Sequence, residues 1–248
     1  MRILIIGATG NSGLALTRLA LSRGHAVTAF VRSEGKLKAS LGPTAELSNL
    51  SVHVGNLSDL AGLSKAMEGQ DVVINAAGNA TVDADYVQMV QSVISTADRV
   101  LGADGRFWFF GGAAALDVPG TGIRTAELPL IPKLFRQHLE NLAFATATSL
   151  DWSMLCPGPM ITSPSGQPHQ DLRISTDIWP VEGPGTNRLF KTIRALAAFK
   201  KRMPEMIISY EDAAKIILDN LEPGGRFAKK RVGAALPKGL TASKSLNF

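Results

Sequence analysis

Three glycines near the N-terminus have the spacing of a phosphate-binding loop. Gly7, Gly10 and Gly13 lie between a short apolar run and a segment with helical periodicity. In such a strand–loop–helix unit, the first glycine allows a tight turn, the second lets a pyrophosphate approach the backbone, and the third lets helix and strand pack closely. The helix N-terminus supplies free N–H groups and a positive dipole end to the phosphates. The loop therefore predicts a dinucleotide site, and the alternative is a purely structural turn. Side-chain donors can come from Thr9, Asn11 and Ser12.

The residue at the end of the second apolar run indicates which dinucleotide such a site prefers. In sites that prefer NAD(H), a carboxylate about 20 residues beyond the loop accepts a hydrogen bond from the ribose 2′-hydroxyl. This chain instead has Arg32, with Lys36 and Lys38 nearby. A guanidinium binds a 2′-phosphate through two hydrogen bonds and stacks on adenine. We therefore expect NADP(H) in preference to NAD(H), and the alternative is a solvated Arg32 with dual specificity.

One histidine and one cysteine are further candidates for chemistry. His138 lies in a segment, about 132–148, that predicts a helix. An imidazole, with its ordinary pKa near 6.5, suits a proton donor, and the alternative is a histidine that faces solvent or is merely hydrogen-bonded. Cys156 is the only cysteine. Because no activating base is identifiable, we expect it to be a small core residue. The four histidines have no metal-ligand spacing with one another or with Cys156, so no metal site is expected.

The elements that must position these residues follow the order of a doubly wound sheet. Strands alternate with helices, which implies a parallel sheet covered on both faces through right-handed crossovers. The predicted fold class is therefore α/β, a Rossmann-type doubly wound parallel sheet. The expected strands are residues 2–6, 26–31, 50–54, 71–76, 107–110 and 152–155. The expected helices run from the glycine loop to Gly24 and then over 59–69, 84–103 and 132–148.

The chain after Pro157 has a different character. Residues 158–188 are rich in proline and glycine and predict a loop that covers the site as a lid, with Trp179 in it. A short strand over 206–209, a helix over 210–221 and a strand over 226–233 are expected to follow. We expect a single domain over 1–248, in which 1–157 is the cofactor-binding core and 158–248 forms a small C-terminal cap on the substrate side.

Composition limits the class of protein and its surroundings. The 248 residues are 45% hydrophobic and carry a net charge of +5, and no apolar run is long enough for a signal peptide or a membrane span. A single cysteine excludes an internal disulfide framework and favours a reducing, cytoplasmic setting. The basic clusters at 200–202 and 229–231 predict solvated faces, so we expect neither nucleic acid nor membrane as a partner.

Several segments resemble the atypical and extended short-chain dehydrogenase/reductase superfamily. Besides the loop GATGNSG, these are VGNLSD at 54–59, DVVINAAG at 71–78, LDWSMLCPG at 150–158 and SYEDAA at 209–214. The chain departs from the family pattern at Asn56, where aspartate is usual, and at Cys156, where arginine is usual. It is most similar to the group of NmrA-like proteins, biliverdin-reductase-B-like flavin reductases and NADH-flavin reductases. The resemblance implies contacts with the cofactor at the adenine (Asn56 and Leu57), at the nicotinamide-side ribose (Ala76, Ala77 and Gly78) and at Pro157.

The resemblance also implies an activity. We expect hydride transfer from NADPH to a small-molecule acceptor, such as a flavin, a quinone or a related conjugated carbonyl, because that chemistry is carried by the cofactor itself. The Tyr-x-x-x-Lys pair used by many reductases of the superfamily is absent: no lysine lies four residues after Tyr86, and Lys215 lies five residues after Tyr210. In such proteins a residue like His138 can take this role. The missing pair leaves two alternatives, a non-catalytic NADP(H)-binding redox sensor of the NmrA type that acts through a protein partner, and a sugar-nucleotide epimerase or dehydratase.

Overall fold

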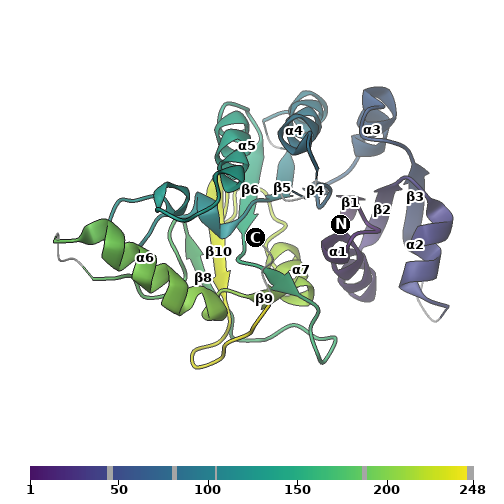
Figure 1. The fold of residues 1–248 in the computed structure, drawn as a ribbon. Coiled ribbons are helices and arrows are strands. Elements are labelled where there is room, and N and C mark those ends of the chain that lie inside the picture. The colour runs from purple at the N-terminus through teal and green to yellow at the C-terminus, as the bar shows by residue number, and fades with distance from the viewer. Residues whose placement is uncertain (44–46, 80–82, 104, 186–188, 245–248) are drawn as a thin grey trace.

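An eight-stranded sheet crosses the molecule and carries helices on both of its faces (Figure 1). The structure is a computed structural model that describes residues 1–43, 47–79, 83–103, 105–185 and 189–244. Within these ranges, none of the helices has the length and apolar character needed to cross a membrane. The strands of the main sheet are β1 (Arg2–Ile6), β2 (Ala26–Val31), β3 (Leu50–Val54), β4 (Val72–Asn75), β5 (Arg106–Phe110), β6 (Asp151–Cys156), β8 (Arg173–Thr176) and β10 (Lys230–Ala235).

The strand order is that of a Rossmann-like sheet. It reads β3-β2-β1-β4-β5-β6-β10-β8, and all neighbouring strands are parallel except β8 and β10. The chain runs outward from β1 to β3 and then returns to the other side of β1 to form β4, so the winding reverses between β1 and β4. In open α/β sheets, ligands bind at the carboxyl ends of the strands at such a reversal. The expected doubly wound parallel sheet is confirmed.

Two apolar cores, one on each face, hold the helices to the sheet. The helices are α1 (Asn11–Ser22), α2 (Glu34–Leu41), α3 (Leu60–Met67), α4 (Tyr86–Leu101), α5 (Gln137–Thr146), α6 (Lys191–Arg202) and α7 (Tyr210–Leu218). Ile3 and Ile5 of β1 pack with residues of α1, α2 and α7, whereas Leu4 and Ile6 pack with residues of α3, α4 and α5. This separation follows from the alternation of side chains along a strand. Figure 1 shows the same two groups of helices on opposite sides of the sheet.

Several helix boundaries agree with the sequence signals. The helix expected over 59–69 is α3, and Asp59 caps it, since its carboxylate accepts a hydrogen bond from the Gly62 N–H at 3.0 Å. Gly24 follows α1 with a φ of 75°, the left-handed conformation expected of a glycine after a helix. The helix expected over 132–148 is shorter, because Pro132 leads into a 3-10 turn, η3 (Lys133–Arg136), and α5 begins only at Gln137. Helix α2 lies where no element was predicted.

The C-terminal part of the chain contains more regular structure than expected. Within the predicted loop over 158–188, β8 joins the sheet, and β7 (Met160–Ile161) pairs with β9 (Ile208–Ser209) in a second, two-stranded sheet. Helix α6 was not predicted either. Helix α7 packs against α1, and β10 lies inside the main sheet between β6 and β8. This part therefore contributes to the sheet and to its helical cover as well as to the loops.

The sequence placed Trp179 in a loop that covers the site, and the structure packs this residue into the body of the protein. Its side chain is buried, and the indole N–H donates a hydrogen bond to Thr125 Oγ1 at 2.7 Å. Thr125 belongs to η2 (Thr125–Glu127), and its own hydroxyl donates to the Leu116 carbonyl at 2.8 Å. The Phe199 ring of α6 lies 5.5 Å from the Trp179 ring. Trp179 thus anchors the segment before α6 to the body of the protein.

Candidate functional site

The glycine loop joins β1 to α1 and lies against the end of β4. Gly7 has a φ of 80°, and a Cβ at this position would lie 2.8 Å from the backbone nitrogen of Ala77. A Cβ on Gly13 would lie 2.7 Å from the Gly7 carbonyl carbon. Gly10, by contrast, is exposed, and a Cβ there would come no closer than 3.4 Å to the chain. Packing therefore requires Gly7 and Gly13, whereas Gly10 leaves the backbone open to a ligand.

The start of α1 has the properties of an anion site. Its N-cap is Gly10, so no side chain caps the helix. The Gly10 N–H donates to the Gly7 carbonyl at 3.0 Å, and the Leu14 N–H donates to the Gly10 carbonyl at 2.7 Å. The N–H groups of residues 11–13 precede the first intrahelical donor, Leu14, and point out of the positive end of the helix dipole. This uncapped terminus beside an open glycine fits the pyrophosphate of a dinucleotide.

A residue from the C-terminal half contacts this loop. The Asn11 side-chain amide donates a hydrogen bond to Tyr210 Oη at 3.2 Å. Tyr210 is the first residue of α7, whose capping box is formed by Ser209 and Asp212. Thr9 and Ser12 are half-buried at the same turn. The loop is therefore held by β4 on one side and by the start of α7 on another.

Arg32 follows β2 directly and is exposed. Across the described ranges, no hydrogen bond or ion pair joins its guanidinium to another residue. The two nearby lysines differ from each other: Lys36 is exposed, whereas the ammonium of Lys38 pairs with Glu34 at 2.7 Å. Arg32 therefore presents a cation to an incoming ligand, and the charge of Lys38 is already compensated within α2.

The other residues expected at the cofactor follow strands of the same sheet edge. Asn56 is exposed after β3, and its Oδ1 accepts from the Ser58 N–H at 3.3 Å, while Leu57 is half-buried. Ala76 and Ala77 are half-buried directly after β4, and Gly78 has a φ of 97°. Pro157, after β6, is buried, and its carbonyl accepts from the Ala113 N–H at 2.8 Å. Because carboxyl ends of parallel strands meet at one edge, the topology gathers these residues beside the glycine loop.

A buried polar cluster lies at the same edge, between α4 and α5. Tyr86 Oη lies 3.3 Å from Nδ1 of His138 and 3.4 Å from the Phe110 carbonyl oxygen. Tyr86 is 4% exposed and His138 is 7% exposed. A Cβ on Gly78 would lie 3.0 Å from the Tyr86 ring, and a Cβ on Gly112 would lie 2.8 Å from Nε2 of His138. The pair therefore lies directly against the ends of β4 and β5.

Burial shifts the pKa values of the two ionisable groups of this cluster in opposite directions. Desolvation lowers the pKa of His138 to about 4. Desolvation raises the pKa of Tyr86 to about 12, and the polar side chain of Asn141 near the phenol oxygen acts against this rise. Asn141 is completely buried, and neither of its side-chain polar atoms has a partner of full hydrogen-bond geometry among the described residues. The imidazole and the phenol therefore both stay neutral near pH 7.

The sequence indicated only one member of this cluster. His138 was a candidate, but Tyr86 was set aside because no lysine follows it at the expected spacing, although it begins the helix after β4. Other polar residues of the predicted helix point elsewhere: Lys133 and Glu140 are exposed. Cys156 is buried as expected, and burial raises the pKa of its thiol to about 12. Among the residues that the structure describes, no group of histidine, cysteine and carboxylate side chains could hold a metal ion.

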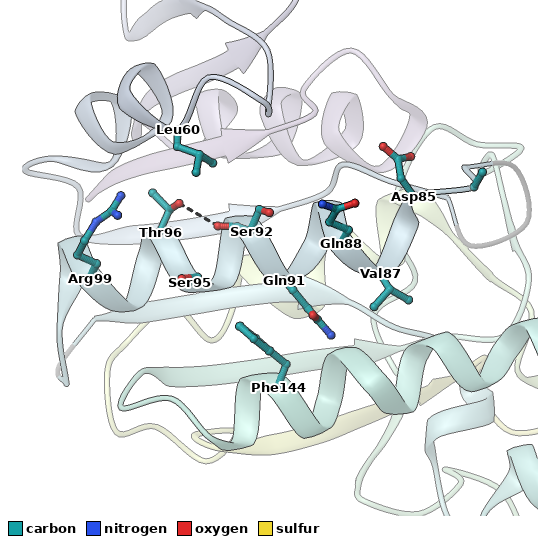
Figure 2. A pocket seen from close by; sticks show the side chains of 11 residues that line it. Leu60, Asp85, Val87, Gln88, Gln91, Ser92, Ser95, Thr96, Arg99 and Phe144 are labelled. Atoms are coloured by element: carbon teal, nitrogen blue, oxygen red, sulfur yellow. Dashed lines mark hydrogen bonds between the residues drawn. The ribbon is translucent and has the colours of Figure 1, made fainter.

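A groove of about 610 Å³ lies away from these residues, on the outer side of α4 (Figure 2). Figure 2 shows Gln88 and Arg99 of α4 lining it, with Leu60 of α3 and Phe144 of α5 on its flanks. None of the residues expected at the cofactor lines this groove. Because it lies outside the strand ends, it is separate from the candidate site.

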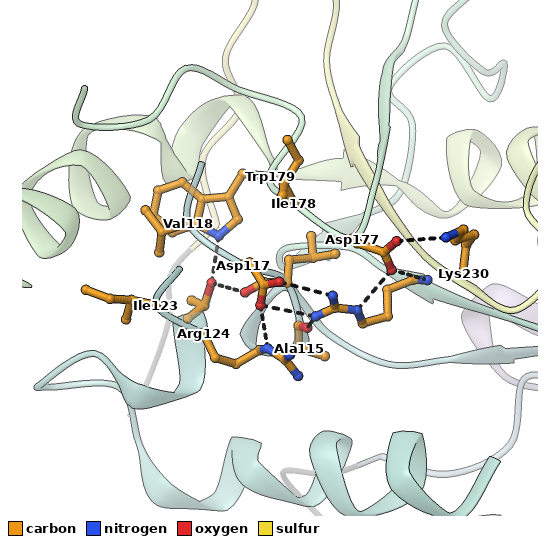
Figure 3. A network of polar contacts seen from close by, with 12 residues as sticks. Ala115, Asp117, Val118, Ile123, Arg124, Asp177, Ile178, Trp179 and Lys230 are labelled. Carbon is orange, nitrogen blue, oxygen red and sulfur yellow. Dashed lines mark hydrogen bonds and ion pairs between the residues drawn. The ribbon is translucent and has the colours of Figure 1, made fainter. Parts of the chain in front are cut away.

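The basic cluster at 229–231 is only in part the solvated face that its sequence suggested: its two lysines are exposed, whereas Arg231 is buried. Arg231 of β10 is 9% exposed and forms ion pairs with Asp117 and Asp177, both at 3.1 Å (Figure 3). Asp117 also pairs with Arg124 at 2.5 Å, and Asp177 with Lys230 at 3.5 Å. These pairs lower the pKa of Asp117, although its burial opposes them. The network joins β10 to the segment that follows β5. Part of the excess of basic residues therefore stabilises the fold and does not face a ligand.

Comparisons with known proteins agree with this geometry. A family model described as NAD(P)H-binding matches residues 7–177, which is more than half of the chain. A photosystem II assembly factor, Ycf39, from Synechocystis sp. is 26% identical over 211 residues, which cover 83% of this chain and 59% of that protein. A phenylcoumaran benzylic ether reductase, IRL1, from Ginkgo biloba is 33% identical over 105 residues, which cover 40% of this chain and 34% of that protein. The chain thus spans from about a third to three fifths of the length of these two relatives.

Solved structures show the same fold over nearly the whole chain. A "putative NADH-flavin reductase" from Streptococcus pneumoniae has a TM-score of 0.69 and 25% identity, and the match covers 96% of this chain and all of that one. A short-chain dehydrogenase/reductase from Veillonella parvula, solved in complex with NADP, has a TM-score of 0.68 and 16% identity, with 99% of each chain covered. By its family match, its strand order and its glycine loop, this chain belongs to the NAD(P)H-binding family and has a Rossmann-like fold.

Proposed function

We propose that this protein oxidises NADPH and transfers the hydride to a flavin, a quinone or a related conjugated carbonyl, with His138 beside the acceptor. The observation that carries this proposal is the position of the Tyr86–His138 pair. It lies against Gly78 and Gly112 at the ends of β4 and β5, on the same edge of the sheet as the glycine loop. A nicotinamide ring that extends from that loop along the sheet edge would reach this pair.

The preference for NADPH rests on Arg32. Its guanidinium is exposed at the end of β2 and has no counter-ion within the described residues, so it could bind a 2′-phosphate. We expect Arg32→Asp to raise the Kd of NADPH on the order of 10²-fold and to change that of NADH only a few-fold. Lys36→Asp is the matched control, because it reverses an exposed charge four residues away. Equal losses for NADPH and NADH would show that Arg32 does not read the 2′-phosphate.

A steady-state assay tests the activity. The purified protein is mixed with NADPH and, in turn, with FMN, riboflavin, a benzoquinone and a naphthoquinone, and the absorbance of the reduced nicotinamide is followed. We expect turnover with at least one of these acceptors and a loss of turnover in His138→Ala. The relation to proteins named as reductases supports this expectation.

A non-catalytic role is the second candidate, and two observations favour it. The chain has no Tyr-x-x-x-Lys pair, and the relative that matches the largest share of it among those compared above is named as an assembly factor. A redox sensor would bind NADPH tightly and oxidise it with none of the acceptors. A sugar-nucleotide epimerase or dehydratase fits less well, because the two buried groups at the strand ends are both neutral near pH 7 and such chemistry needs a strong base.

A further inference from the structure

The Tyr86–His138 contact joins residues that are far apart in sequence and restrains the imidazole on several sides. Nδ1 of His138 lies 3.3 Å from Tyr86 Oη, and the two rings meet edge to face at 5.7 Å. The Phe135 ring stacks on the imidazole at 6.2 Å with an angle of 12° between the planes. Nε2 lies on the side of Gly112, where a Cβ would come within 2.8 Å of it. One ring nitrogen is therefore engaged by Tyr86, and the other borders the end of β5.

We propose that Tyr86 is a positioning residue that holds His138 as a neutral imidazole with its proton on Nε2, so that the site offers the acceptor a hydrogen bond and not a proton. The geometry carries this assignment. A neutral imidazole has one N–H and one acceptor nitrogen. When the Tyr86 hydroxyl donates to Nδ1, the ring proton must be on Nε2. The Phe110 carbonyl oxygen, 3.4 Å from Tyr86 Oη, is the competing acceptor for this hydroxyl proton. We assign the hydroxyl proton to the hydrogen bond with Nδ1, and nitrogen-15 NMR distinguishes the two arrangements.

The surroundings oppose the charged form of either group. Burial lowers the pKa of His138 to about 4, so the imidazolium is not populated at neutral pH. Burial raises the pKa of Tyr86 to about 12, and the charges of Cys156 and Asp83 raise it further. No other ionisable group contributes to the pKa of His138. The pair therefore stays neutral from about pH 5 to about pH 11.

This assignment rests on the proposed function and narrows its substrate class. In the reaction, the C4–H bond of the nicotinamide breaks, its electron pair forms the new bond to the acceptor, NADPH becomes NADP⁺, and the acceptor is reduced by two electrons. The proton that completes the reduction comes from water. A flavin or a quinone tolerates this order, since its reduced anion spreads the charge over a conjugated system. An isolated ketone would produce a localised alkoxide, which needs an acid close by.

Three variants separate a neutral donor from an acid. In His138→Gln, the side-chain amide N–H can replace Nε2–H, whereas His138→Ala removes it. We expect His138→Gln to keep kcat within about 5-fold of the native value and His138→Ala to lose on the order of 10²-fold, because one preorganised donor is removed. We expect Tyr86→Phe to lower kcat about 10-fold and to leave the Kd of NADPH unchanged. An acid role would instead make His138→Gln as inactive as His138→Ala, and that result would overturn the proposal.

Nitrogen-15 NMR of histidine-labelled protein tests the tautomer independently of turnover. The His138 signals are assigned by their loss in His138→Gln. We expect a proton on Nε2 and none on Nδ1, unchanged between pH 5.5 and 9, and a mixture of tautomers in Tyr86→Phe. A proton on Nδ1 in the native protein, or a ring that titrates in this range, would refute the role of Tyr86.

The outcomes distinguish this inference from the proposed function. If the protein reduces simple ketones as fast as flavins and quinones, the acceptor class inferred here is wrong and the reductase activity stands. If none of the acceptors supports oxidation of NADPH, the reductase proposal fails together with the acceptor class. The NMR result still decides the tautomer of His138.

Discussion

The buried imidazole of His138 predicts a loss of stability in weak acid. The pKa of this group is about 4 in the folded protein and 6.5 in the unfolded chain. As the pH falls below 6.5, the unfolded chain takes up a proton that the folded protein does not, so the unfolded state gains stability. Each pKa unit corresponds to about 1.4 kcal/mol, and the full difference therefore corresponds to about 3 kcal/mol. This loss is absent above pH 6.5 and develops between pH 6.5 and 4.

Urea unfolding at pH 7.5 and pH 4.5 measures this effect. At pH 4.5 most of the loss has developed, so the native protein should be about 2–3 kcal/mol less stable than at pH 7.5 through His138 alone. His138→Gln removes the ionisable group and should lose correspondingly less between the two pH values, whatever its stability at pH 7.5. His53→Gln is the control, because it removes an imidazole that stacks on Phe30 at 5.4 Å and leaves the Tyr86–His138 contact intact.

A parallel loss in the native protein and in His138→Gln would refute this reasoning. It would mean that His138 takes up a proton in the folded state near its ordinary pKa, and the imidazole would then be solvated or paired with an anion. That result would also refute the assignment of His138 as a neutral hydrogen-bond donor. If the difference is confined to His138→Gln and absent in His53→Gln, burial of this one ring is the cause.

Three further predictions concern stability and ligand binding. Arg231→Met should lower the free energy of unfolding by about 3 kcal/mol, because two aspartates lose their buried partner, whereas Lys230→Met, which breaks a longer and more exposed pair, should cost less than about 1 kcal/mol; denaturant titration compares the two. Gly13→Ala should destabilise the protein by about 1–3 kcal/mol and weaken NADPH binding, because its Cβ would meet the Gly7 carbonyl. Gly35→Ala is the control, because nothing lies within 4 Å of a Cβ there, and it should be neutral or slightly stabilising. Thermal unfolding compares the two variants. At alkaline pH, the raised pKa of Tyr86 should reduce stability between about pH 10 and 12, since the unfolded chain ionises first, and Tyr86→Phe should flatten that decline.

The first six strands could be predicted because each is a short apolar run with turn residues at its ends. Both faces of the sheet are covered, so most residues of these strands are apolar and the strands stand out in the sequence. Strand β3, at the edge of the sheet, is the exception, because its residues are half-buried or exposed. Helix α6 was missed because its apolar face is formed by small or half-buried side chains, and only Ala195 is fully buried. Strand β8 was missed because it is an edge strand of four half-buried or exposed residues, Arg173–Thr176. Strand β8 therefore lacks the pattern of a buried strand, whereas α6 is amphipathic but buries too few large apolar side chains to be conspicuous in the sequence.

Some residues of the candidate site could be predicted from local sequence, and others are brought together only by the fold. The glycine loop is contiguous, and its function depends on local backbone geometry, so seven residues of sequence were enough to predict it. The Tyr86–His138 pair depends on how α4 and α5 lie across the ends of β4 and β5, and no local spacing encodes that distance. Arg231 is similar: in sequence it is the end of a basic cluster, and only the sheet brings it to Asp117 and Asp177. Sequence patterns do not predict such contacts between residues that are far apart in the chain.

The position of β10 inside the sheet has a consequence for how the protein is made. During synthesis, β6 keeps an open edge and β8 lacks its neighbour until residues 230–235 leave the ribosome. Helix α1 likewise waits for α7, and Asn11 waits for Tyr210. Such non-local pairing is slow to form, and an unpaired strand edge favours association between nascent chains. The glycine loop is thus synthesised well before α7, the helix that packs beside it, and the surroundings of the site are complete only after residues 210–218 have folded against α1.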